Sequence, residues 1–131
     1  MNVLIDTHIA LWAIAGSKRL SARARDIIAA PENAIHVSAA SLWEIAIKHA
    51  LKRKGAGAMP ISAAQAHTYF AAAGYAILPI SPQHVVALEA LPSLHADPFD
   101  RMLIAQSASE PLHLLTHDAD FAAYGVHVLV V

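Results

Sequence analysis

The chain has 131 residues, of which 56% are hydrophobic and 15% charged, and a formal net charge of −1; this fits one globular domain and argues against a long disordered tail. It contains no cysteine, which excludes disulfide bonds and thiolate zinc sites. Its apolar runs are far shorter than the ~20 residues that cross a bilayer, and its start lacks the basic region of a signal peptide. We therefore expect a cytoplasmic protein without a membrane anchor.

The expected elements alternate between strands and helices. Local signals mark their ends: Gly16 stops the first helix, Ser21 caps the second ahead of Pro31, and Ser81-Pro82 opens another. In chain order we predict a strand over residues 2–5, helices over 8–15 and 21–30, a strand over 35–38, helices over 39–54 and 62–74, a strand over 76–80, helices over 81–91 and 97–109, and strands over 113–116 and 126–131.

This alternation predicts an α/β fold with a mostly parallel five-stranded sheet and helices on both faces. In such sheets, functional side chains gather outside the carboxyl ends of the strands, near the point where the strand order reverses. We therefore expect the polar and charged side chains of a functional site to come directly after the strand ends in the sequence.

Acidic side chains do follow them. Asp6 comes directly after the first predicted strand, and Asp118 lies two residues past the fourth. Glu44 lies on the helix after the second strand, and Asp97 and Asp100 begin the helix that leads into the fourth. The sequence around these acids is otherwise apolar.

Each acid also has an ordinary structural explanation. Asp6, Asp97 and Asp118 are well placed to cap the helices or turns that follow them. Glu44 lies four residues before Lys48, as in a surface ion pair worth ~0.2–0.5 kcal/mol. Taken together, however, carboxylates converging on one crevice would repel one another unless a cation lay among them. Mg²⁺ and Mn²⁺ prefer such oxygen ligands, and one or two of these ions support phosphodiester hydrolysis.

Four stretches, in this order and spacing, resemble the motifs of PIN-domain ribonucleases, most closely VapC-type toxins of type II toxin–antitoxin pairs. They are residues 4–8 (Leu-Ile-Asp-Thr-His), 38–48, 95–106, and 115–118 with Phe121 and Tyr124-Gly125. The resemblance covers essentially the whole chain. It implies a single PIN domain over residues 1–131, a three-layer sandwich.

The same resemblance implies a Mg²⁺- or Mn²⁺-dependent endoribonuclease, with RNA as substrate and a cognate VapB-type antitoxin that blocks the site. The family's acids fall on Asp6, Glu44, Asp100 and Asp118. Asp97 is either an additional metal ligand or only a helix cap, and Asp120 is a weaker substitute for Asp118. Three further side chains are candidate substrate contacts: Thr7 and Thr116 through their hydroxyls, and Arg101, which could equally neutralise the acids.

Other signals leave more than one interpretation open. His113 and His117 bracket a strand, which separates them by about 13 Å and disfavours a shared zinc ion. His95 either lies near the site or simply ends a loop. The basic end of the 39–54 helix either binds the RNA backbone or is a solvated helix terminus; its cations are Lys48, Lys52, Arg53 and Lys54.

Apolar residues occur on more than one face of the 39–54 helix, which predicts that it is buried either inside the domain or against a partner. A homodimer and an antitoxin interface are both compatible with this pattern. Trp12 and Trp43 are expected in the core or such an interface.

The charge distribution is uneven. Residues 1–59 hold eight Lys and Arg and four acids, whereas residues 60–131 hold one base and six acids. A nuclease could use both signs, but two solvated faces are the plainer explanation.

Two rival functions remain at this stage. A receiver-type phosphoryl-transfer domain also gathers acids around Mg²⁺, but it needs a basic residue near the phosphoryl group, and no lysine follows residue 60. A non-catalytic binding module could retain the fold without the activity. RNA cleavage that Asp100→Asn abolishes would separate the nuclease from both.

Overall fold

A five-stranded parallel sheet organises the chain in the computed structural model, which describes residues 1–125 and 127–131. The elements are β1 (Asn2–Ile5), α1 (Thr7–Ala15), α2 (Ala22–Ala29), β2 (Ala34–Ser38), α3 (Ala39–Ala50), η1 (Gly55–Gly57), α4 (Ala63–Ala72), β3 (Ala76–Leu78), α5 (Pro82–Ala90), α6 (Pro98–Ser109), β4 (His113–Thr116), η2 (Ala119–Tyr124) and β5 (Val128–Val130). The α/β fold predicted from the alternation of strands and helices is confirmed.

The strand order is β3-β2-β1-β4-β5, and every neighbouring pair is parallel. From β1 the chain adds strands on one side, through β2 to β3, and then returns to add β4 and β5 on the other side. The strand order therefore reverses between β1 and β4. The carboxyl ends of these two strands are where parallel α/β proteins carry ligands.

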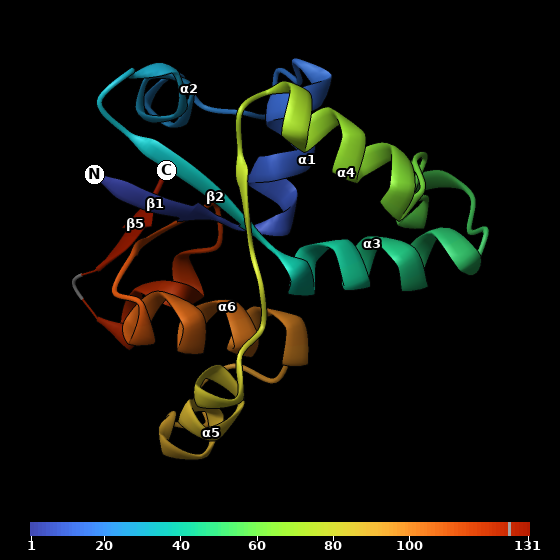
Figure 1. The fold of residues 1–131 in the computed structure, drawn as a ribbon. Coiled ribbons are helices and arrows are strands. Elements are labelled where there is room, and N and C mark those ends of the chain that lie inside the picture. Colours follow the sequence, from blue (N-terminus) through green and yellow to red (C-terminus); the bar gives the residue numbers. More distant parts are fainter. Residues whose placement is uncertain (126) are drawn as a thin grey trace.

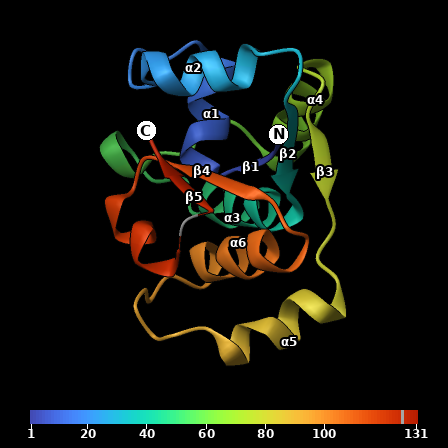
Figure 2. The same ribbon diagram turned by 90° about the vertical axis from the view of Figure 1, so that its left-hand side faces the viewer.

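Helices cover both faces of the sheet (Figures 1 and 2). Alternate side chains of β1 point to opposite faces, so Val3 and Ile5 belong to a core cluster with residues of α1, α2 and α4. Leu4 belongs to a second cluster, formed mainly with α6 and β4. The predicted three-layer sandwich is thus confirmed. No helix in the described ranges is long and apolar enough to cross a membrane.

Helix α3 extends from the carboxyl end of β2 and packs against α4 beyond the edge of the sheet (Figure 1). It ends at Ala50, four residues earlier than predicted. Lys52 has a φ of 50°, in the left-handed region, and turns the chain back towards α4. The His49 ring holds the returning chain through a 2.9 Å contact of Nδ1 with the Met59 carbonyl. The prediction that Lys52, Arg53 and Lys54 lie on the helix is therefore wrong; they lie in the loop after it.

Other boundaries differ by a few residues. Thr7 already belongs to α1, because Asp6 is its cap. β3 stops at Leu78, two residues before the predicted end. β5 covers Val128–Val130, and the part of its prediction that falls on Val126 lies outside the described residues.

Candidate metal centre

Asp6 lies buried at the end of β1, with 5% of its surface exposed. As the cap of α1 it accepts a 2.8 Å hydrogen bond on Oδ1 from the Ile9 backbone N–H. Its Oδ2 accepts a 2.6 Å hydrogen bond from the Thr116 hydroxyl at the end of β4. Burial raises the pKa of Asp6 and nearby Glu44 adds to the rise, whereas these two hydrogen bonds lower it. Its carboxylate therefore bridges the two strands at the reversal point.

Glu44 is 4% exposed, although it lies on a helix that is otherwise partly open to solvent. Its Oε2 forms the predicted pair with Lys48, at 2.6 Å from Nζ. This is not the surface pair expected from the spacing, because the carboxylate is buried. Its Oε1 is also buried and has no hydrogen-bond partner. An orphaned anionic oxygen is costly, and a cation at the site would satisfy it.

Asp100 lies in the first turn of α6. Its pKa is raised to about 7, mainly because the carboxyl is buried; next come the nearby charges of Asp97, Glu44 and Asp6, and His95 lowers it. The side chains of Asp6, Glu44 and Asp100 therefore interact electrostatically in one place. After burial, the like charges of the neighbouring acids oppose the ionisation of Asp100, and a bound cation would relieve that repulsion.

His95 joins Asp100 to Asp118, the fourth acid. Its Nε2 lies 3.4 Å from Oδ2 of Asp100 and 3.4 Å from Oδ2 of Asp118. In the described part of the chain, these three residues form the one His and carboxylate cluster whose ligand atoms all lie within 4.8 Å of one another. The sequence left the place of His95 open, and its nearness to Asp97 was the only signal for it.

Asp97 and Asp120, the two remaining acids, are less well placed to bind a metal. Asp97 caps α6, with Oδ1 accepting hydrogen bonds from the backbone N–H groups of Phe99 and Asp100 at 2.9 and 3.0 Å. The charge of Asp97 also raises the pKa of Asp100, so it acts electrostatically on the metal centre. Asp120 is exposed on η2, where its backbone N–H donates to Asp118.

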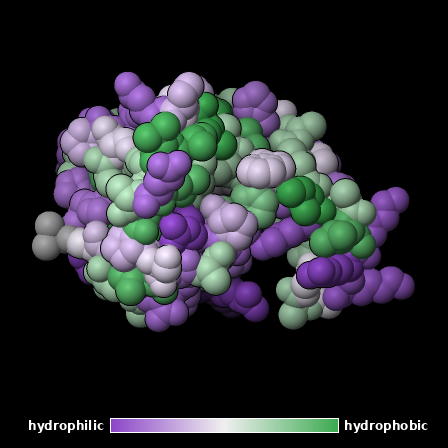
Figure 3. All heavy atoms as spheres, turned by 90° about the horizontal axis from the view of Figure 1, so that it is seen from below, coloured by the Kyte–Doolittle hydropathy of each residue, from purple (hydrophilic) through white to green (hydrophobic). Residues whose placement is uncertain are grey.

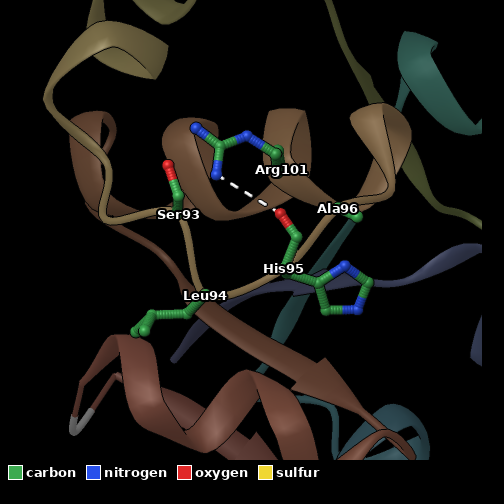
Figure 4. Close-up of a pocket in the computed structure, with 5 residues that line it drawn as sticks. All are labelled: Ser93, Leu94, His95, Ala96 and Arg101. Carbon is green, nitrogen blue, oxygen red and sulfur yellow. Dashed lines mark hydrogen bonds between the residues drawn. The ribbon is translucent and has the colours of Figure 1, made fainter.

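The three side chains predicted to contact the substrate already form hydrogen bonds within the protein. Thr7 donates to the Ser41 hydroxyl at 2.8 Å, which ties α1 to α3, and Thr116 donates to Asp6. Arg101 donates to the backbone carbonyls of three residues that precede α6: Leu88, Pro92 and His95. It forms no ion pair with an acid within residues 1–125 and 127–131, so the expected internal pair is not seen. Figure 4 shows Arg101 and the His95 ring pointing to opposite sides of the loop.

A groove of about 800 Å³ adjoins Lys48 and opens between α1 and the loop that follows α3. Its walls carry apolar side chains and three cations: Arg19, Lys48 and Arg53. Trp12 lines it half-buried, in ring contact with His8 and His117. No three-ligand cluster in the described residues includes His113 or His117, so nothing supports zinc there.

Trp43 was expected in the core or an interface, and it is 58% exposed. Together with Ile47 and Leu51 it forms an exposed row at a spacing of four residues, and its ring meets Phe99 of α6 edge-on. Figure 3 shows hydrophobic side chains over the end of α3, next to charged ones. Such a row is typical of a surface that a partner covers.

The donor set fits a hard divalent cation. Asp6 after β1 and Glu44 on α3 are buried, and Asp100 on α6 is partly buried; the three carboxylates are near enough to interact electrostatically. One oxygen of Glu44 is orphaned, and the pKa values of Asp6 and Asp100 are raised. Oxygen donors of this kind suit Mg²⁺ or Mn²⁺.

We expect Thr116→Val to weaken this centre. Valine keeps the shape but removes the hydrogen bond to Asp6 and leaves the Asp118 backbone N–H without its 3.0 Å acceptor. The loss should destabilise the fold by about 1–3 kcal/mol and lower Mn²⁺ affinity by about 10-fold. Urea unfolding and calorimetry measure the two effects. Thr116→Ser, which keeps the hydroxyl, is the control; an equal loss in both variants would contradict the role of the hydrogen bond.

Comparisons with known proteins agree with this fold. The family model described as PIN domain matches residues 3–126. VapBC2 from Rickettsia felis, solved bound to a promoter DNA fragment, is 16% identical with a TM-score of 0.70, covering 100% of this chain and 98% of that one. A toxin–antitoxin complex from Klebsiella pneumoniae is 22% identical with a TM-score of 0.64, covering 98% and 96%.

A third structure, Mycobacterium tuberculosis VapC20, is described as a toxin that cleaves the sarcin–ricin loop. It is 19% identical with a TM-score of 0.60, covering 96% of this chain and 98% of that one. No curated relative matches the chain.

Proposed function

Because this chain belongs to the PIN domain family, we propose that it is a Mg²⁺- or Mn²⁺-dependent endoribonuclease, the toxin of a VapBC-type toxin–antitoxin pair. The proposal includes a single domain over residues 1–131 that acts in the cytoplasm. The observation that carries it is the buried Asp6 at the reversal of strand order, together with the nearby buried Glu44 and its orphaned Oε1.

In this proposal Asp6, Glu44 and Asp100 hold the metal, and Asp118 completes the site from the end of β4. When bound, the metal would activate water and stabilise the leaving oxygen of the RNA phosphodiester. The protein's own contribution is to fix the carboxylates in advance. The Ile9 N–H and the Thr116 hydroxyl orient Asp6, and Lys48 holds one oxygen of Glu44 and leaves the other free.

The phosphate backbone of RNA needs cations outside the carboxylate cluster. Lys48, Arg53 and Arg19 line the groove that adjoins the centre. We propose that RNA phosphates follow this basic wall into the site. In this proposal Thr7 and Thr116 support the site and do not contact RNA, since both hydroxyls already donate to partners within the protein.

A cognate VapB-type antitoxin and a homodimer are also part of the proposal. Two of the similar structures are toxin–antitoxin assemblies by their descriptions. The exposed row of Trp43, Ile47 and Leu51 fits a surface that another chain covers.

The direct test uses purified protein freed of antitoxin, incubated with labelled structured RNAs that include a sarcin–ricin loop. We expect cleavage with Mn²⁺ or Mg²⁺, none with EDTA, and none by Asp100→Asn purified in the same way. Calorimetry with Mn²⁺ measures metal binding separately. If no RNA is cut and no Mn²⁺ binds, the non-catalytic binding module becomes the better interpretation. Cleavage that persists in the variant would contradict the assigned site.

Arg101 gives a separate prediction. Because its guanidinium donates to backbone carbonyls, Arg101→Met should destabilise the fold by about 1–3 kcal/mol, the range for lost charged hydrogen bonds. The dependence of RNA binding on salt should stay unchanged, measured with Asp100→Asn as the background to prevent cleavage. A phosphate contact would instead reduce the salt slope by about one. The same substitution at Arg53 is the positive control, since Arg53 lines the groove.

A further inference from the structure

We propose that His95 is a positioning residue of the metal centre, whose Nε2–H donates to Oδ2 of Asp118 and faces Oδ2 of Asp100. The inference rests on the proposed metal-dependent function and assigns a part of that site to a residue outside its acids. Three groups hold the ring: the backbone of Asp97, the ring of Phe121 and, through the loop, Arg101.

The protonation of the ring follows from its second nitrogen. The Asp97 backbone N–H donates to Nδ1 of His95 at 3.2 Å. A backbone amide is always a donor, so Nδ1 must be an acceptor and carries no proton in the neutral ring. The ring proton then lies on Nε2, which faces Oδ2 of Asp100 and Oδ2 of Asp118 at 3.4 Å each. Both carboxylates are acceptors, so the arrangement is consistent at every atom.

The same contact argues against His95 as a metal ligand. A ring that bound a metal through Nε2 would carry its proton on Nδ1. That proton would then point at the Asp97 N–H, and two donors would face each other across 3.2 Å. The loop backbone therefore selects the tautomer that donates to carboxylates over the tautomer that coordinates a cation. Partners of this kind orient metal-binding carboxylates and tune the metal without touching it.

The ring is fixed from its other sides as well. It is 16% exposed and packs edge-on against buried Phe121, at 5.1 Å between ring centroids and 87° between planes. Arg101 donates to the carbonyls of Pro92 and His95 from the far side of the loop, where a hollow of about 410 Å³ opens (Figure 4). These contacts leave little freedom for the imidazole to turn away from the acids.

The position of His95 explains how the side chains of Asp100 and Asp118 can be held near each other. Asp100 belongs to α6 and Asp118 to the turn after β4, so no backbone hydrogen bond holds their side chains together. Two carboxylates at this separation repel each other. In the proposal, the Nε2–H that donates to Asp118 also attracts the oxygen of Asp100 at 3.4 Å, which favours one arrangement of both carboxylates before a metal binds.

Two substitutions separate this role from support of the loop. In His95→Gln the amide nitrogen reaches the position of Nε2 and can donate to the carboxylates. In His95→Asn the amide oxygen reaches the position of Nδ1 and can accept the Asp97 N–H, but the donor is lost. We expect Mn²⁺ affinity, measured by calorimetry, to fall about 10- to 100-fold in His95→Asn, and to stay within about 3-fold of wild type in His95→Gln. Circular dichroism checks that both variants are folded.

A second readout does not depend on either variant's stability. Long-range ¹H–¹⁵N spectra of metal-free protein labelled at histidine, recorded where the rings are neutral, should show the proton of His95 on Nε2; the signals missing in His95→Gln assign it. A proton on Nδ1 would overturn the proposal. So would nitrogen coupling from the His95 ring in the electron paramagnetic resonance spectrum of bound Mn²⁺, because that would make it a ligand.

Three further outcomes of the metal-binding and cleavage measurements would each decide against at least one of the proposals. Normal affinity in His95→Asn with weak affinity in His95→Gln would mean that the ring only anchors Asp97, against the proposal. Wild-type protein that binds Mn²⁺ with the expected tautomer but cuts no RNA would overturn the proposed nuclease and leave the role of His95 standing. Wild-type protein that binds no Mn²⁺ would overturn both.

Discussion

Asp100→Asn is expected to lower the rate of RNA cleavage by more than about 100-fold, since changes outside the ligands themselves already cost about 10- to 100-fold at metal centres. The substitution keeps the size of the side chain and removes the charge that would hold the cation. The charges of Asp97, Glu44 and Asp6 raise the pKa of Asp100, so a bound cation would favour its ionised form. Single-turnover cleavage with saturating Mn²⁺ measures the effect.

Asp97→Asn is the matched control, three residues earlier on the same helix. Asparagine caps helices as well as aspartate does, so the hydrogen bonds to the N–H groups of Phe99 and Asp100 should survive. We expect the rate of RNA cleavage to fall by less than about 10-fold, because removing the charge of Asp97 weakens the negative potential at the metal centre. An equal, large loss in both variants would mean that Asp97 is itself a ligand. Full activity of Asp100→Asn would contradict the whole assignment.

Helix starts could be predicted from sequence because the signals that set them are local. Ser21, Ser62, Ser81 and Asp97 each accept a hydrogen bond from a backbone N–H two or three residues later, in the positions that their residue types indicate. The end of α3 could not be predicted. It depends on Lys52 adopting a positive φ so that α4 can pack back against α3, a tertiary requirement that overrides the helical pattern of the sequence.

The convergence of the acids could be predicted for a similar reason. Asp6 and Asp118 follow strands that lie side by side, and parallel strands end at the same edge. The contacts that the neighbouring residues make around the acids could not be predicted from the sequence. His95 meets Asp118 across 23 residues of sequence, and within the described residues Arg101 donates to carbonyls of α5 and of the loop after it, and forms no ion pair with an acid. Contacts of this kind depend on how an irregular loop folds, which no periodicity encodes.

The same acids should make the metal-free protein less stable as the pH rises. The folded-state pKa of Asp100 is about 7, against 3.8 for an unperturbed carboxyl, so between these values the folded protein binds a proton that the unfolded chain has released. The contribution of Asp100 to the free energy of unfolding should therefore fall from about pH 4 to pH 7 and level off above that. The raised pKa of Asp6 acts in the same direction. The stabilising contribution is present below the unfolded pKa and is lost as the folded group ionises.

Urea unfolding of wild type and Asp100→Asn across this pH range isolates the contribution of Asp100, because the other titrating groups are common to both proteins. We expect the wild type to lose about 1–2 kcal/mol more than the variant; this is below the full linkage value because the carboxyl is 25% exposed and partly screened. Mn²⁺ at 100 times its dissociation constant should restore about 2.7 kcal/mol in wild type at neutral pH, since it binds only the folded state. The variant should gain much less. Parallel pH curves for the two proteins, or an equal gain from Mn²⁺, would mean that the repulsion at this centre is not what the metal relieves.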